Sequence, residues 1–196
     1  MGMTDGSSAM DLDRQYTIAD WRKWPDDERW ELIDGLAYAM SPSPWVEHQD
    51  RALEVGRRLA DFLEDKPCRA FIAPLDVFLQ AADGKAESDK DGDGDIVVQP
   101  DVMAVCDPDK IHPDGIYGAP DFVVEVLSDS TANKDFGVKK ELYERCGVRE
   151  YWIVQPETDT VFQYVLDGTI FAPVREYRRG VPVTSSVFEG FTWARK

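Results

Sequence analysis

Apolar residues recur along this chain with two periods, one typical of helices and the other of strands. Helical spacing predicts helices over about residues 18–24, 45–65 and 132–146. Short apolar runs bounded by Gly, Pro and Asp predict strands, and Asp34-Gly35 between two such runs is a strong hairpin signal. The predicted strands are two within residues 30–40, followed by 70–79, 96–106, 121–127, 150–154, 160–166 and 169–176.

This alternation of strands and helices predicts an α/β fold with one mixed β-sheet flanked by helices. At 196 residues the chain is long enough for one well-packed domain. The first dozen residues are small and polar, so we expect a disordered N-terminal segment over residues 1–15 and a single domain over residues 16–196. The segment 107–120 is rich in Pro, Gly and Asp and is expected to be a loop.

The sequence contains neither a membrane-spanning segment nor a signal peptide, which bears on the cellular location of the protein. No apolar run approaches the roughly 18–20 residues that span a bilayer, and the N-terminus lacks the pattern of a signal peptide. We therefore expect a cytoplasmic protein with no membrane partner. Cys68, Cys106 and Cys146 are few, odd in number and far apart, which favours buried free thiols over a disulfide framework or a zinc site.

The charge is unevenly distributed. The formal net charge of -16 is unfavourable for a nucleic-acid partner, which normally requires a basic surface. Residues 1–130 hold 12 Lys and Arg against 29 Asp and Glu, whereas residues 131–196 hold 10 against 9. Only the C-terminal third is therefore suited to face a polyanion.

Two carboxylates stand within otherwise apolar strand sequences. Side chains alternate across a strand, so Glu125 shares one face with Asp121 and Val123. A buried carboxylate is costly unless it is paired or bound to a metal, and the same holds for Asp101 in the preceding strand. If the two strands pair, Asp101 and Glu125 are close enough to share Mg²⁺ or Mn²⁺, cations that take oxygen ligands.

The helix that follows offers an amine to this pair. At about 100° per residue, Lys139 lies in the middle of the apolar face of the helix and Lys140 lies toward its edge. A buried lysine needs an anionic partner, which the two carboxylates or a phosphate bound beside them would provide. Asp135, one turn earlier, is the alternative partner for Lys139.

Several motifs, in this order along residues 17–175, resemble the Uma-type "putative restriction endonuclease" family, a bacterial group within the PD-(D/E)XK nuclease superfamily. The motifs are Glu31-Leu-Ile-Asp-Gly35, Ser41-Pro42 followed by His48, Pro100-Asp101-Val, Gly118-Ala-Pro-Asp121, Val124-Glu125-Val-Leu-Ser128, Lys139-x-x-x-Tyr143 and Gly147-Val-Arg-Glu-Tyr-Trp-Ile-Val154.

The resemblance implies a restriction-endonuclease-like core in which Asp101 and Glu125 bind the metal and Lys139 assists cleavage of DNA phosphodiester bonds. In the wider superfamily a lysine stands two residues after the glutamate, a position that Leu127 occupies here. The family pattern has its lysine on the next helix instead. A homodimer is expected, because many nucleases of this superfamily use two copies to reach both strands.

Three further residues have open roles. Glu31 and His48 are candidates for an accessory role, as ligands of a second ion or as groups that position the first helix. For His48, a histidine packed on an apolar helix face is the alternative. Asp121 also follows a proline and shares a strand face with Glu125, so it either binds the metal or begins the strand.

Two other functions remain open. One is a non-catalytic module that binds nucleic acid or protein and retains the nuclease fold, which the charge of -16 favours. The other is a metal-dependent hydrolase of a smaller phosphate ester.

Overall fold

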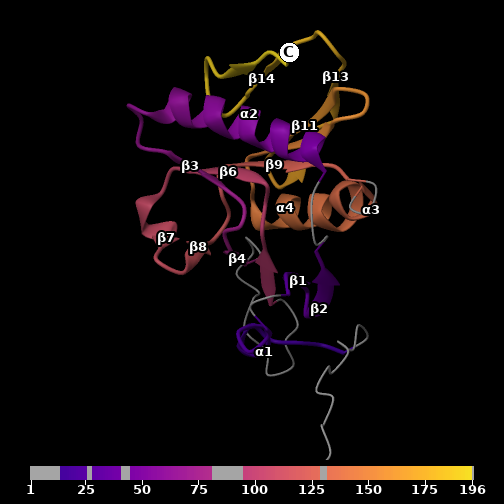
Figure 1. The fold of residues 1–196 in the computed structure, drawn as a ribbon. Helices are drawn as coiled ribbons and strands as arrows, with labels where there is room; N and C mark the ends of the chain where they lie inside the picture. The colour runs from indigo at the N-terminus through magenta and orange to yellow at the C-terminus, as the bar shows by residue number, and fades with distance from the viewer. Residues whose placement is uncertain (1–13, 26–27, 41–44, 81–94, 129–131, 196) are drawn as a thin grey trace, which may run out of the picture.

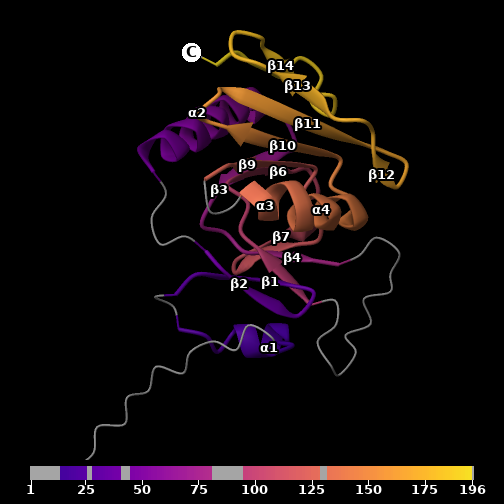
Figure 2. The same cartoon turned by 90° about the vertical axis from the view of Figure 1, so that its right-hand side faces the viewer.

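The computed structural model describes residues 14–25, 28–40, 45–80, 95–128 and 132–195. Within them, two large β-sheets are stacked, with one helical layer between them and one helix on the outer face of each (Figures 1 and 2). The predicted N-terminal segment 1–15 lies almost wholly outside the described residues. The predicted α/β class, with mixed β-structure flanked by helices, is confirmed.

The sheet that carries Glu125 has seven strands and is mixed. Its order is β12-β11-β10-β9-β6-β3, with β13 paired to β11. Strands β9 and β10 are parallel and joined by the central helices, while the neighbouring pairs are antiparallel. Its strands are β3 (Arg69–Ile72), β6 (Val102–Val105), β9 (Phe122–Val126), β10 (Glu150–Gln155), β11 (Thr160–Asp167), β12 (Ile170–Phe171) and β13 (Arg175–Tyr177).

A second sheet of six strands was not predicted. Its order is β2-β1-β5-β4-β8-β7. Its strands are β1 (Trp30–Ile33), β2 (Leu36–Ala39), β4 (Val77–Leu79), β5 (Ile96–Val98), β7 (Ile111–His112) and β8 (Gly115–Tyr117). The predicted hairpin at Asp34-Gly35 is confirmed, and both residues have positive φ. The segment 107–120, predicted as a loop, contains a 3₁₀ turn, η1 (Pro108–Lys110), and the β7–β8 hairpin.

The prediction of one sheet is wrong because two predicted strands each cross from one sheet to the other. The strand predicted at 70–79 splits into β3 and β4, and the strand at 96–106 splits into β5 and β6. A proline stands in each break, Pro74 and Pro100, and proline cannot donate a ladder hydrogen bond. Asp101 therefore lies where the chain passes between the sheets. A further proline, Pro173, likewise separates β12 from β13 within the strand predicted at 169–176.

The helices occupy three layers. Helix α1 (Ile18–Trp21) starts with a capping box formed by Thr17 and Asp20 and covers the six-stranded sheet. Helix α2 (Val46–Leu63) covers the outer face of the seven-stranded sheet together with the hairpin β14–β15 (Val183–Thr184, Thr192–Trp193). Between the sheets lie α3 (Ala132–Lys134), a π-helical turn η2 (Asp135–Lys139) and α4 (Lys140–Cys146) (Figure 2). Gly147 ends α4 in a left-handed conformation with φ 85°, directly after the helix predicted over residues 132–146.

The two faces of β9 serve different cores. Val123 packs into the core between the sheets, which also contains Tyr143 from α4. Phe122 and Val124 pack into the core beneath α2. The predicted alternation is thus confirmed, and Glu125 shares its face with Val123, toward the central helices.

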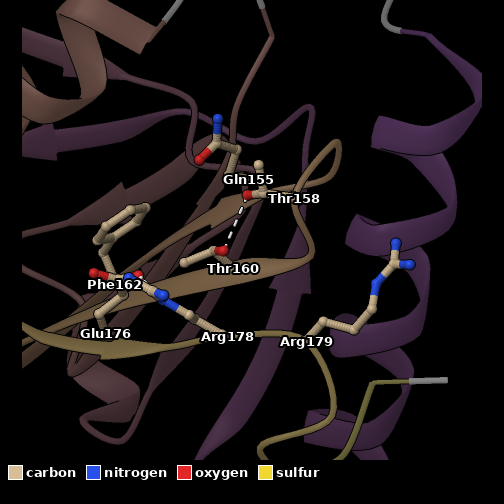
Figure 3. A pocket seen from close by; sticks show the side chains of 7 residues that line it. All are labelled: Gln155, Thr158, Thr160, Phe162, Glu176, Arg178 and Arg179. Carbon is tan, nitrogen blue, oxygen red and sulfur yellow. Dashed lines mark hydrogen bonds and ion pairs between the residues drawn. The ribbon is translucent and has the colours of Figure 1, made fainter.

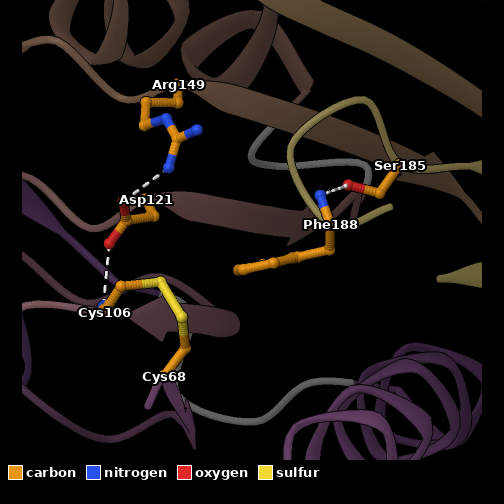
Figure 4. Close-up of a disulfide and its surroundings, with 6 residues drawn as sticks. All are labelled: Cys68, Cys106, Asp121, Arg149, Ser185 and Phe188. Atoms are coloured by element: carbon orange, nitrogen blue, oxygen red, sulfur yellow. Dashed lines mark hydrogen bonds and ion pairs between the residues drawn. A yellow bond between two sulfur atoms is a disulfide. The ribbon is translucent and has the colours of Figure 1, made fainter. Parts of the chain in front are cut away.

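The prediction of three free thiols is wrong. Cys68 and Cys106 form a disulfide, while Cys146 is free and buried (Figure 4). The antiparallel pairing of Arg69 with Val105 puts the two cysteines opposite each other at the strand ends. Spacing along the sequence does not reveal this register. Within the described residues, no helix is long and apolar enough to cross a membrane.

Candidate active site

Asp101 and Glu125 meet where β6 begins and β9 ends. Val102 pairs with Val124 in the antiparallel ladder, so each acid lies one residue beyond that pair. Asp101 Oδ2 accepts a hydrogen bond of 2.8 Å from the backbone N–H of Val126. Glu125 is only 4% exposed. The pairing on which the predicted metal site depended is therefore present.

Lys139 reaches this pair from the π-helical turn. Its Nζ lies 2.7 Å from Glu125 Oε1 and 2.8 Å from Glu31 Oε1, and the lysine is 3% exposed. Asp135, the alternative partner, is farther away, at 3.9 Å. Lys140 points elsewhere, with its Nζ 6.0 Å from the ring of Tyr164. Short π-helical turns are often found at functional sites, and this one turns both Asp135 and Lys139 inward.

Glu31 joins the cluster from the other sheet. It is fully buried on β1, and its Oε1 also accepts the backbone N–H of Gln99 at 3.1 Å. Its Oε2 lies 2.6 Å from Nζ of Lys134. The cluster thus connects both sheets through the helical layer, and Glu31 contacts the candidate lysine directly.

Two members of the cluster were not predicted. Lys134 pairs with Glu31, and the hydroxyl of Tyr143 donates a 2.7 Å hydrogen bond to Glu125 Oε1. The i,i+4 spacing of Lys139 and Tyr143 puts both on one helix face and is the signal that could have found Tyr143. Lys134 shows no such signal, because its partner lies 103 residues away.

His48 contacts the other acid. Its Nε2 lies 3.2 Å from Asp101 Oδ2, and the side chain is 12% exposed. Among the described residues, its Nδ1 is buried without a hydrogen-bond partner. Burial favours the neutral ring, but the hydrogen bond and charge of Asp101 outweigh it and raise the pKa of His48. Helix α2 is thereby linked to the metal-ligand candidate.

Asp121 lies at the opposite end of β9 from Glu125. Its Oδ2 accepts the backbone N–H of Cys106 at 2.8 Å, and its Oδ1 lies 3.0 Å from the guanidinium of Arg149 (Figure 4). The structure does not bring Asp121 to the cluster. Its contacts are those of a residue that fixes the start of the strand.

The electrostatics of the cluster are dominated by burial and excess acid. Burial raises the pKa of Glu125 to about 8, with Lys139 opposing this and Asp101 adding to it. Burial lowers the pKa of Lys139, but the surrounding carboxylates outweigh it and raise that pKa well above its usual value. For Glu31 the two lysines overcome burial and hold its pKa below the ordinary value. Lys139 is therefore charged, and Glu125 can take up or release a proton near neutral pH.

Comparison with known proteins decides the family. Residues 18–195 match the Uma2 family, described as "Putative restriction endonuclease". The chain belongs to the Uma2 family. The fold is similar to that of "a putative nuclease belonging to DUF820 from Anabaena variabilis", with a TM-score of 0.70 and 18% identity over 91% of this chain and 94% of that one. No curated protein matches the sequence. The resemblance to this family inferred from the motifs is confirmed. Membership of the Uma2 family supports the general functional class of nucleases for this chain.

The donor set of this Uma2 chain fits a hard divalent cation in its chemistry. Asp101, Glu125, Glu31 and Asp135 supply four carboxyl groups against the amines of Lys134 and Lys139. Among the described residues, no three His, Cys, Asp or Glu side chains are arranged to hold a metal. Two carboxylates with waters and a substrate oxygen are nevertheless a common ligand set for Mg²⁺. Asp101 and Glu125 are the pair that could supply it.

Two hollows lie near the ends of β9 and β10. One, of about 150 Å³, is lined by His48, residues 127–128 and Pro156 among others. The other is an open groove of about 470 Å³ beyond the β10–β11 turn, into which Arg178 extends (Figure 3). Gln155, which ends β10, lines the groove, and Thr158 follows it in the turn. The smaller hollow shares His48 with the acid site, whereas the groove lies on the far side of β10 from β9.

Proposed function

We propose that this protein is a Mg²⁺- or Mn²⁺-dependent DNA endonuclease that hydrolyses phosphodiester bonds. The observation that supports it most is the buried contact of Lys139 with Glu125, beside Asp101 at the adjoining strand end. A structural ion pair needs one acid for one base. Here the acids outnumber the amines, and a divalent cation would balance them.

Asp101 and Glu125 would hold the ion, which when bound polarises a phosphate oxygen and lowers the pKa of a coordinated water. Tyr143 and Lys139 fix Oε1 of Glu125, so the orientation of this ligand is set before substrate arrives. His48 and the N–H of Val126 do the same for Asp101. The charged amine of Lys139 would stabilise negative charge that develops on the phosphate during attack.

The groove beyond the β10–β11 turn supports a nucleic-acid substrate. The side chains of Arg178 and Arg179 line it and are 80% and 76% exposed, although Arg178 also pairs with Glu176 at 2.7 Å. Strands β9, β10, β11 and β13 are neighbours, so Arg178, just beyond β13, lies about three strand spacings, or roughly 14 Å, from β9. That is about four nucleotides along one strand. These arginines would contact phosphates flanking the scissile bond.

Nicking of supercoiled plasmid tests this proposal. Wild-type protein should nick in Mg²⁺ or Mn²⁺ and not in EDTA, while Asp101→Asn, Glu125→Gln and Lys139→Met should each lose at least about a hundredfold in rate. Asp121→Asn is the matched control, because it removes an acid from the other end of β9 and should keep the rate within a few fold. Plasmid binding without cleavage would favour the non-catalytic module instead.

A homodimer that cuts both strands is part of this proposal. It predicts a complex of two 22.2 kDa chains plus the mass of the bound DNA in sedimentation analysis. A monomer that only nicks would refute this part and leave the chemistry unchanged.

A further inference from the structure

A tryptophan stands in solvent beside the acid cluster. Trp45 precedes the first turn of α2 and is 74% exposed, and the adjacent Val46 is 76% exposed. Trp is normally highly buried, and aromatic side chains left exposed next to a polar site are typical of binding surfaces. His48, three residues later, contacts Asp101. The exposed indole is thus about one helical turn from the histidine that contacts a candidate metal ligand.

The smaller hollow lies against this indole. Its volume is about 150 Å³, and its lining consists of Trp45, Glu47, His48, Leu127, Ser128, Pro156 and Glu157. An apolar cavity of about this volume accommodates one benzene ring. Leu127 is two residues beyond Glu125, so a ring in this hollow would lie next to the reacting phosphate.

The residues that line the hollow determine which kind of ring could bind there. The indole of Trp45, the ring of Pro156 and the side chain of Leu127 are apolar surfaces against which a flat ring can stack. Glu47 and Glu157 are carboxylates, which repel a phosphate and accept hydrogen bonds from amino groups such as N4 of cytosine. A nucleobase satisfies both features, whereas a phosphate satisfies neither.

We propose that this hollow, which we call the base pocket, takes one unpaired nucleobase beside the scissile phosphate, stacked on Trp45. The proposal rests on the proposed nuclease function. A base in a duplex has both faces stacked and its edge paired, so it must leave the helix or come from a single strand to enter such a pocket. The substrate is accordingly a single strand, or a duplex in which the nucleotide at the cut site is flipped out of the helix.

Equilibrium binding of a fluorescent single-stranded oligodeoxynucleotide in EDTA tests the base pocket without cleavage. Trp45→Ala should weaken binding by about 5- to 100-fold, as measured for stacking on aromatic side chains, and Trp45→Phe should restore most of it. Leu53→Ala is the matched control, since Leu53 is on the same helix and is 62% exposed. It should bind as the wild type does.

A second experiment measures binding to a set of oligonucleotides that each contain one abasic site, at a different position in each oligonucleotide. At one position the missing base should weaken wild-type binding as much as Trp45→Ala does, and the variant should lose nothing further there. Additive losses at every position would overturn the base pocket. If the wild type nicks plasmid while Trp45→Ala binds and cuts equally well, the base pocket is wrong and the proposed nuclease function stands. If the wild type neither binds nor cuts DNA, both are wrong.

Discussion

Substitution of Lys139 tests most directly how much the buried acid cluster contributes to the free energy of unfolding. In Lys139→Met, Glu31 keeps Lys134 at 2.6 Å and the N–H of Gln99 at 3.1 Å. Glu125 keeps only the hydroxyl of Tyr143 among these contacts. Breaking a buried pair by removing one partner costs about 3–5 kcal/mol, because an uncompensated charge is left behind. For a chain of this size that is a loss of roughly 6–20 °C in Tm.

The effect should depend on pH with a definite sign. The raised pKa of Lys139 keeps it charged, so its contribution depends on whether its partner carboxyls are ionised. The pKa of Glu125 is about 8, so at pH 5.5 this group is protonated with or without the lysine. The destabilisation should therefore be smaller at pH 5.5 than at pH 8, and it should keep growing as the pH rises past the pKa of Glu125.

Urea unfolding followed by far-UV circular dichroism at the two pH values measures this. Lys140→Met is the matched control, because Lys140 is the next residue and its Nζ lies 6.0 Å from the centre of the ring of Tyr164, away from the acid cluster. It should change the free energy of unfolding by less than about 1 kcal/mol. Equal urea midpoints for the Lys139 and Lys140 variants at pH 8 would refute the view that the amine balances buried acids.

Three further predictions concern the metal, the hydroxyl and the disulfide. Since burial raises the pKa of Glu125 to about 8, Mg²⁺ binding at pH 7 should release a proton and tighten as the pH rises; calorimetry in two buffers measures the release, and its absence would contradict this prediction. Tyr143→Phe should cost about 1–2 kcal/mol in urea unfolding and lower the cleavage rate, while an unchanged rate would show that its bond to Glu125 is not needed. Cys68→Ser with Cys106→Ser should cost up to about 4 kcal/mol, given the sequence separation of 38. Thiol titration of the denatured protein should find one reactive cysteine before reduction and three after, and three before reduction would contradict the bridge.

The local part of the site could be predicted because it depends on periodicity. Strand alternation placed Glu125 on the inner face of β9, and helical spacing selected Lys139 over Lys140. Both are properties of a few consecutive residues, so the sequence contains them directly. The pairing of β6 with β9 was a conditional expectation that the structure confirms.

The remainder depends on contacts distant in sequence. Glu31 reaches Lys139 only because β1 belongs to a second sheet that packs on the central helices, and no local pattern indicates that sheet. The Cys68–Cys106 bridge depends on the register of β3 with β6. Asp121 resembled Asp101 because each follows a proline, yet the antiparallel ladder places them at opposite ends of β9.

Anomalous scattering from a crystal soaked in Mn²⁺ tests the central claim most directly. The account predicts one Mn²⁺ ion bound by a carboxylate oxygen of Asp101 and one of Glu125, with the amine of Lys139 beside it and no ion at Asp121. A crystal in which Mn²⁺ binds elsewhere, with Lys139 still held between Glu31 and Glu125, would contradict it.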